Sequence, residues 1–142
     1  MRITLVELGV LAPANQSAWA TTIVVVEKPD GSVWICGDYW STVNTAVKRE
    51  GYPLPTLDEA FARIAGGTMF SKIDLAYNQV VVDESTAELL TINTHRGLFR
   101  VNRLWFGVNV APPRFQQLID GLLAGPDGVI VLLDDVLVTG GN

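Results

Sequence analysis

The chain has 142 residues, of which 49% are hydrophobic, and its formal net charge is −5. These values suit one folded domain with a real core and exclude disorder, and the negative charge argues against strong non-specific binding to nucleic acid. A single cysteine, Cys36, excludes an internal disulfide and suits a reducing compartment. Because Glu7 interrupts the apolar start and no later run is long enough for a membrane span, we expect a cytoplasmic or nuclear protein without a signal peptide.

The first third of the chain predicts a short helix and a β-hairpin. Residues 1–9 have an amphipathic pattern that ends at Gly9, which is typical of a helix stop. Residues 21–27 are rich in β-branched side chains and predict a strand. Lys-Pro-Asp-Gly at 28–31 is a strong turn signal, so residues 32–39 are expected to return as the partner strand.

A stiff connector and a well-marked helix come next. The two prolines of residues 51–55 disfavour helix before them and predict an extended segment. Thr56 and Glu59 form a capping-box pattern, which predicts a helix that continues through Ile64 and ends at Gly66-Gly67. Residues 69–75 are then expected to form a strand.

The rest of the chain predicts further strands and one helix. Strands are expected at residues 80–82, 89–93 and 98–101, with a turn at residues 95–97. Pro112-Pro113 predicts a helix start, because proline in the first helical turn loses no hydrogen bond, and this helix continues through Leu123. A Gly-Pro-Asp-Gly turn at residues 125–128 leads into the final segment.

The final segment, residues 129–139, places two adjacent aspartates between two apolar runs. Each run predicts a buried strand, so Asp134 and Asp135 are expected at or near the tip of a hairpin. One interpretation is that Asp-Asp is only a turn, although two-residue hairpin turns favour Asn-Gly or Asp-Gly instead. The other is that a bound cation relieves the repulsion of two neighbouring carboxylates.

Asp74 supplies a third carboxylate, because it closes an apolar strand as Asp134 does. Strands that end at the same edge of a sheet can bring such acids together. Converging carboxylates are the ligands that Mg²⁺ requires, and two ions can clamp the oxygens of a phosphoryl transfer. Three aspartates at strand ends are also common in proteins without a metal site, and the pattern by itself leaves both interpretations open.

Positive charge is concentrated in one stretch of this acidic chain. Residues 89–119 contain no carboxylate, and they include His95 and the arginines at positions 96, 100, 103 and 114. One interpretation is an ordinary solvated face. The other is a local surface that tolerates phosphate.

A series of motifs, in chain order, resembles one known family. Leu132-Leu133-Asp134-Asp135 resembles the Tyr-x-Asp-Asp box of reverse transcriptases, and residues 70–75 resemble the strand that carries their first catalytic aspartate. Further matches lie at residues 32–39, 52–55, 90–98, 102–104 and 106–108. The chain is thus similar, over essentially its whole length, to the polymerase segment of gypsy-class LTR-retrotransposon polyproteins.

The resemblance implies an α+β fold with the fingers and palm of a right-handed polymerase. It implies an antiparallel palm sheet with packed helices, and no thumb, connection or RNase H region. By this resemblance residues 1–68 are mostly fingers, and residues 69–142 are mostly palm with a fingers-type insertion near 80–105.

The resemblance also assigns roles to individual residues. Asp74, Asp134 and Asp135 are expected to coordinate two Mg²⁺ or Mn²⁺ ions in RNA-directed DNA polymerisation. Phe106 and Gly107 are expected to line the nucleotide pocket, where Lys28 approaches the triphosphate and Tyr77 is the aromatic gate against a ribose 2′-hydroxyl. The residues expected to contact nucleic acid are Arg96, Arg100 and Leu132. For Phe106 and Tyr77 the alternative is core packing, and for Lys28 it is a solvated turn. The implied partners are an RNA or DNA primer-template, dNTPs and the rest of a retroelement polyprotein.

Several positions depart from the family pattern. Trp34 stands where an arginine that contacts the triphosphate is common, Trp40 replaces a basic residue, Trp105 replaces proline, and Leu132 replaces the tyrosine of the Asp-Asp box. Tyr77 also lies two residues closer to the aspartate than usual. We therefore expect the isolated fragment to be inactive, and we infer a decayed retroelement copy.

Two functional hypotheses remain open. The first is a fingers–palm fragment of a reverse transcriptase that keeps its metal-binding aspartates. The second is a non-enzymatic remnant or interaction module that keeps the fold without the activity. A small unrelated α/β domain whose Asp-Asp pair is only a turn is the remote third interpretation.

Overall fold

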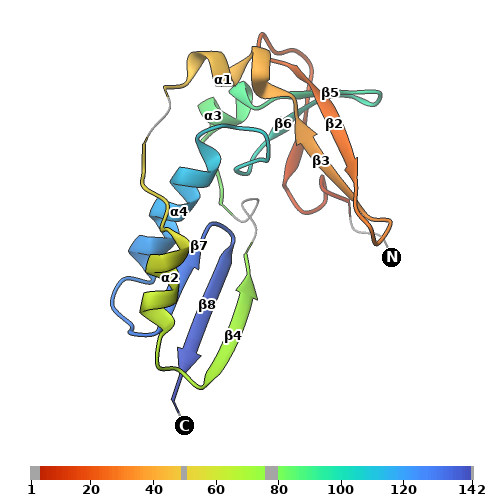
Figure 1. The fold of residues 1–142 in the computed structure, drawn as a ribbon. Coiled ribbons are helices and arrows are strands. Elements are labelled where there is room, and N and C mark those ends of the chain that lie inside the picture. Colours follow the sequence, from red (N-terminus) through yellow and green to blue (C-terminus); the bar gives the residue numbers. More distant parts are fainter. Residues whose placement is uncertain (1–3, 49–50, 76–79, 142) are drawn as a thin grey trace. The chain divides into compact units, whose positions relative to one another are not determined.

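The computed structural model describes residues 4–48, 51–75 and 80–141 of the chain. The chain forms two compact units: unit 1 combines Met1–Arg49 with Tyr77–Ala111, and unit 2 combines Glu50–Ala76 with Pro112–Asn142. Each unit mixes helices with a β-sheet (Figure 1), so the expected α+β class is confirmed. In the described part of the chain, no helix is both long and apolar enough to cross a membrane.

Unit 1 is built on a five-stranded sheet with the strand order β1-β6-β5-β2-β3. Its strands are β1 (Leu11–Ala14), β2 (Thr21–Glu27), β3 (Val33–Gly37), β5 (Ile92–Thr94) and β6 (Gly97–Val101). Three short helical segments accompany the sheet: η1 (Tyr39–Ser41), α1 (Val43–Ala46) and α3 (Glu84–Leu89). The β2–β3 hairpin confirms the predicted pair of strands, and its turn is closed by hydrogen bonds between Lys28, Gly31 and Ser32.

The core of unit 1 surrounds Tyr39, which is 1% exposed. Its hydroxyl donates a 2.9 Å hydrogen bond to the carbonyl of Leu90, so the buried polar group is satisfied. Trp105 is also buried in this core. Gly107 has a φ of +100°, and a Cβ at that position would lie 2.3 Å from the carbonyl oxygen of Gly37. Only glycine therefore fits there without a shift of the backbone.

The predicted N-terminal helix is wrong for the described residues. Residues 5–9 form hydrogen-bonded turns, and the strand β1 follows them. The amides of Val10 and Leu11 both donate to the carbonyl of Leu5, which closes the turn after a few residues. β1 then pairs with β6 at the edge of the sheet, where Pro13 costs no ladder hydrogen bond on the open side.

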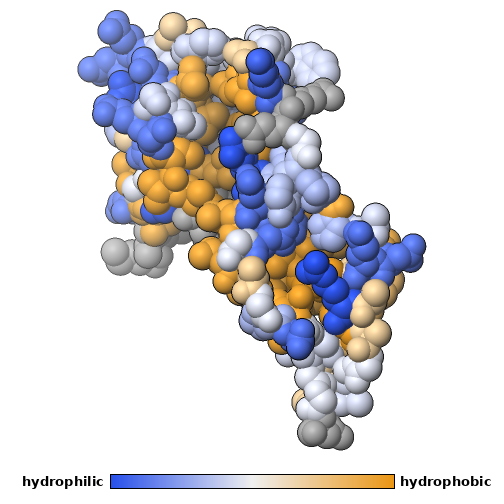
Figure 2. Space-filling view, turned by 90° about the vertical axis from the view of Figure 1, so that its left-hand side faces the viewer, coloured by the Kyte–Doolittle hydropathy of each residue, from blue (hydrophilic) through white to orange (hydrophobic). Residues whose placement is uncertain are grey.

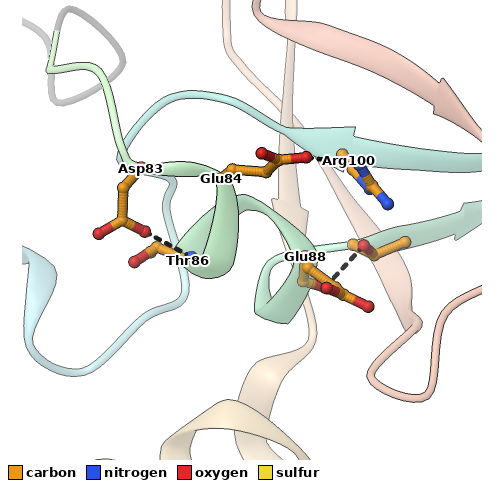
Figure 3. A network of polar contacts seen from close by, with 6 residues as sticks. Asp83, Glu84, Thr86, Glu88 and Arg100 are labelled. Carbon is orange, nitrogen blue, oxygen red and sulfur yellow. Dashed lines mark hydrogen bonds and ion pairs between the residues drawn. The ribbon is translucent and has the colours of Figure 1, made fainter.

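The strand predicted at residues 89–93 is partly wrong, because Leu89 ends helix α3 and the strand begins only at Ile92. The Asp83 side chain accepts a 2.7 Å hydrogen bond from the Thr86 amide, which caps this short helix (Figure 3). The strand predicted at 80–82 is reduced to an isolated bridge between Val81 and Arg103.

Unit 2 contains an antiparallel three-stranded sheet with the order β4-β8-β7. Its strands are β4 (Met69–Asp74), β7 (Val129–Leu132) and β8 (Asp135–Gly140), and its helices are α2 (Leu57–Ile64) and α4 (Ala111–Leu122), the latter from Pro112 onward. α2 lies beside β7, and β4 forms the opposite edge (Figure 1). The capping box of Thr56 and Glu59 is present, which confirms the predicted start of α2.

The core of unit 2 is small. Ala60, Phe115, Ile130, Val131 and Val136 are buried. Large apolar side chains remain on the surface of this unit, among them Leu57, Phe61, Met69, Phe70 and Leu122, each at least 60% exposed. Figure 2 shows hydrophobic surface between hydrophilic side chains in its lower part, which is unit 2. The unit therefore carries more apolar surface than its own helices cover.

Candidate active site

Strand register brings two of the three candidate aspartates side by side. β4 pairs with β8 in antiparallel register from Met69↔Gly140 to Asp74↔Asp135. Side chains that are directly opposite in a sheet lie on the same face, with Cβ atoms about 5 Å apart. The side chains of Asp74 and Asp135 therefore share one face at one end of the sheet. Leu132, which is opposite Asp135 on β7, lies on that face too.

The hairpin between β7 and β8 turns through two residues, Leu133 and Asp134. Leu133 has a φ of +57°, the left-handed region, and it is the only non-glycine residue in the described part of the chain with a positive φ. This conformation is unfavourable for a leucine and persists only where the surroundings hold it. Asp134 lies in the turn, and Asp135 is the first residue of β8.

Gln116 on α4 holds this turn. Its side chain is completely buried, and its Oε1 accepts a 2.6 Å hydrogen bond from the amide of Leu133. Its Nε2 donates to the carbonyl of Val131 at 3.0 Å and to the carboxylate of Asp120 at 2.9 Å. One buried amide thus satisfies backbone groups on both sides of Leu132. The sequence analysis missed Gln116, because nothing in a single sequence marks which glutamine points into a core.

A lysine lies between the two paired aspartates. The Lys72 ammonium is 3.2 Å from a carboxylate oxygen of Asp74 and 3.1 Å from one of Asp135. The hydrogen bond with Asp135, and then the one with Asp74, raises the pKa of Lys72, and the Lys72 contact lowers the pKa of Asp74. The sequence analysis missed Lys72 as well, although its position two residues before Asp74 on one strand is a signal that could have found it.

The paired aspartates offer part of what a divalent cation requires. Two carboxylates already hold one cationic group, and carboxylate oxygens are the ligands that Mg²⁺ prefers. Asp134 lies in the hairpin turn, and its backbone carbonyl accepts a 2.6 Å hydrogen bond from the amide of Leu75. Within the described residues, no group of three or more His, Cys, Asp or Glu side chains is gathered to hold a metal ion.

Two of the residues expected at the nucleotide pocket, Phe106 and Lys28, contact Trp34 in unit 1. The rings of Trp34 and Phe106 are stacked with centroids 6.1 Å apart, and the Lys28 ammonium lies 4.6 Å from the centroid of the Trp34 ring. Lys28 therefore makes a cation–π contact with a half-exposed indole. Gly107, the next residue after Phe106, packs its backbone closely against the carbonyl of Gly37. Tyr77 lies outside the described residues.

The arginines expected to contact nucleic acid differ in their surroundings. Arg96 is exposed in the turn between β5 and β6. Arg100 is partly buried on β6, and its guanidinium lies 3.7 Å from the carboxylate of Glu84 on α3 (Figure 3). The charge of Arg100 is thus partly offset within unit 1, whereas Arg96 presents its charge to solvent. The absence of carboxylates from residues 89–119 did not reveal this pairing, because Glu84 lies outside that stretch.

No protein-family model matches the chain. The sequence is 42% identical over 137 residues to an uncharacterized protein of Caenorhabditis elegans, covering 94% of this chain and 11% of that protein. It is 32% identical over 123 residues to the Tf2-3 transposon polyprotein of Schizosaccharomyces pombe, covering 84% of this chain and 9% of the polyprotein. The chain is homologous to a segment of retrotransposon polyproteins.

Solved structures of retroviral proteins share the fold. A foamy viral protease–reverse transcriptase in complex with double-stranded DNA matches with a TM-score of 0.87 and 24% identity, over 97% of this chain and 24% of that one. The native protease–reverse transcriptase of prototype foamy virus matches with a TM-score of 0.81 and 25% identity, over 97% and 19%. A third, in complex with an RNA/DNA hybrid, has a TM-score of 0.84 at 23% identity, over 97% and 19%.

The chain spans only about a tenth of the length of the curated relatives that it matches. The Tf2 polyproteins among them show a relation to retroelement polyproteins.

Proposed function

We propose that the chain is a fingers–palm segment of a retrotransposon reverse transcriptase, which carries the aspartates of two-metal nucleotidyl transfer. The observation that carries the proposal is the register pair Asp74–Asp135, whose carboxylates already hold a cation at the end of an antiparallel sheet. The similarity to a transposon polyprotein and the fold shared with foamy viral protease–reverse transcriptases support the same function.

In this proposal Asp74, Asp134 and Asp135 hold Mg²⁺ or Mn²⁺. When bound, the ions stabilise the charge on the attacking and leaving oxygens of phosphoryl transfer. The contribution of the chain is to fix the positions of its ligands. Strand pairing sets Asp74 against Asp135, and the Gln116 amide holds the turn that contains Asp134.

The remaining assignments concern substrates. Phe106, Gly107, Tyr77 and Lys28 are proposed to contact an incoming dNTP. Arg96, Arg100 and Leu132 are proposed to contact an RNA or DNA primer-template. Solved foamy viral relatives were captured with double-stranded DNA and with an RNA/DNA hybrid, which supports this class of partner. The rest of a retroelement polyprotein is a further proposed partner.

The metal site is tested by thermal unfolding in the presence of Mn²⁺. A ligand that binds only the folded state raises the melting temperature by mass action, and carboxylates without substrate phosphates should need millimolar ion. We expect millimolar Mn²⁺ to raise the melting temperature of the wild-type chain and to leave an Asp134→Asn/Asp135→Asn variant unchanged. An equal shift in both proteins would remove the basis for a metal site at these aspartates.

We expect the 142-residue chain, tested by itself, to bind metal without extending a primer. Phosphoryl transfer depends on positioning and on offsetting charge, and Trp34 has one N–H donor and no charge to offer a triphosphate. In addition, the Lys28 ammonium already contacts the ring of Trp34, which stacks on Phe106. Template-dependent incorporation by the unmodified chain, abolished by Asp134→Asn, would contradict this expectation.

The same stack favours the second candidate function, a non-enzymatic remnant that keeps the fold. The sequence departures Trp34 and Trp105 add apolar packing to unit 1, where one joins an aromatic stack and the other is buried in the core. The two functions separate when the unmodified chain and a repaired variant, Trp34→Arg/Trp105→Pro/Leu132→Tyr, are each joined to the thumb and connection of a related element. DNA synthesis by the unmodified fusion supports the polymerase, and synthesis by the repaired fusion alone supports the remnant.

A further inference from the structure

The cation between Asp74 and Asp135 belongs to the chain itself. Lys72 and Asp74 are two residues apart on β4, so their side chains lie on the same face of the sheet. Asp135 is opposite Asp74 on β8, which places the second carboxylate diagonally across from Lys72. Both carboxylates lie within 3.2 Å of the one ammonium group. Strand register therefore brings the three side chains within reach of one another.

This ammonium occupies the position that a divalent ion needs. Oxygens of both carboxylates point at the same Nζ, and an ion bound by those oxygens would meet a positive charge at ion-pair distance. Like charges at such distances repel, and the same lone pairs cannot serve both partners at full strength. Ammonium binding and metal binding at Asp74 and Asp135 therefore compete.

The contact is nevertheless easy to break. The side chains of Lys72 and Asp74 are 54% and 78% exposed, and that of Asp135 is 37% exposed. Exposed ion pairs of this kind contribute little net free energy, because water competes for both partners and salt screens them. Lys72 can hold the carboxylates together without metal and still yield to a divalent ion at moderate concentration.

We propose that Lys72 is a tethered counter-ion of the candidate metal site, which competes with divalent cations for Asp74 and Asp135 and so sets the concentration that the site requires. The inference rests on the proposed function of these aspartates. It adds a residue that touches both carboxylates and that reduces their mutual repulsion before metal arrives.

The test is a titration with Mn²⁺, followed by electron paramagnetic resonance of the free ion, on four proteins without nucleotide or nucleic acid. Lys72→Met removes the ammonium and keeps the stem, and Lys72→Arg keeps a charge at the same place. Lys48→Met is the matched control, because it removes one lysine charge from an exposed position in unit 1.

We expect Lys72→Met to bind Mn²⁺ about three- to tenfold more tightly than wild type, which corresponds to the loss of two weak ion pairs. Lys72→Arg and Lys48→Met should stay within about twofold of wild type, because a competing charge at position 72 is present in both.

A second measurement uses the wild-type chain and does not depend on how a variant folds. The ε-methylene resonance of Lys72 should move when Mg²⁺ is added, and it should reach a plateau at the concentration at which the ion binds. The corresponding resonance of Lys48 should not move. In an Asp134→Asn/Asp135→Asn variant the Lys72 resonance should no longer respond.

The outcomes separate the inference from the proposed function. If wild type binds Mn²⁺ and Lys72→Met binds it equally or more weakly, the counter-ion role is refuted while the metal site stands. If neither protein binds Mn²⁺ and the Lys72 resonance stays still, the proposed metal site fails, and the counter-ion role fails with it. A gain in affinity equal to that of Lys48→Met would show only a general effect of net charge and would also refute the role of Lys72.

Discussion

Replacing Gln116 by methionine tests whether one buried amide holds the turn of the Asp-Asp hairpin. Methionine has nearly the same volume, so the substitution leaves little cavity and isolates the loss of hydrogen bonds. The side chain of Gln116 makes three of them, to Leu133, Val131 and Asp120. Asp120 keeps a partner, because the Tyr52 hydroxyl donates to its other oxygen at 2.8 Å. The cost therefore falls on the amide of Leu133 and the carbonyl of Val131.

The magnitude follows from those two backbone groups. A buried group left without a partner costs about 1–3 kcal/mol, and the lower half of that range applies to Leu133, which is only partly buried. We expect Gln116→Met to lower the free energy of unfolding by about 2–4 kcal/mol, a large fraction of the stability of a small domain. The change also removes a constraint that keeps Leu133 in the left-handed region, so the turn itself should open more often.

Two assays measure the effect. Urea unfolding gives the change in the free energy of unfolding of the whole chain, and amide hydrogen exchange reports the opening of the turn at Leu133. Gln117→Met is the matched control, because Gln117 is the same residue type on the same helix and is exposed. A loss below about 0.5 kcal/mol, unchanged exchange at Leu133, or an equal loss in the control would refute the role given to Gln116.

Three further predictions concern backbone conformation and burial. Gly107→Ala should destabilise the chain by more than Gly97→Ala, because both glycines have a positive φ but only the first would place a Cβ against a carbonyl oxygen. Urea unfolding of the two variants measures the difference. Equal losses of unfolding free energy would contradict the close approach at Gly107. Leu133→Val should lower the free energy of unfolding by about 1 kcal/mol more than Leu133→Ala, because a β-branched residue is least tolerated at φ +57°. Hydrophobicity alone would predict the opposite order of the two variants. That opposite order in urea unfolding would argue against the left-handed turn. Burial raises the pKa of Tyr39, so the folded state holds the phenol proton more tightly than the unfolded chain, and the stability that this proton contributes should be lost as pH rises above about 10. Tyr39→Phe should remove this alkaline loss while lowering the free energy of unfolding by about 1 kcal/mol at neutral pH. If thermal unfolding shows the same alkaline limit in the variant, another group is responsible.

Local patterns in the sequence were sufficient wherever a structure depends on near neighbours. The start of α2 was predicted because a capping box involves residues three apart, Thr56 and Glu59. The turn at residues 28–31 was predicted because proline and glycine restrict the backbone directly. The hairpin of residues 129–139 was predicted from two apolar runs around a short polar break, and its β7 and β8 strands confirm it.

Tertiary contacts decided the features that these patterns did not predict. β1 exists because β6 offers it an edge, and a four-residue segment with a proline has no strand signal of its own. Residues 89–93 are apolar enough for a strand, but Leu89 belongs to helix α3, which Asp83 caps, and only the residues from Ile92 onward form β5.

The candidate site shows the same division. That Asp74, Asp134 and Asp135 are acids at strand ends is visible in the sequence. Which two of them lie side by side was decided by the register of β4 and β8, and the turn that contains Asp134 is held by Gln116 of helix α4. Lys72 became part of the site for the same reason, because the same register places it within reach of both carboxylates. The residue types were determined locally, and their distances were determined by long-range pairing, which a single sequence does not encode in any one stretch.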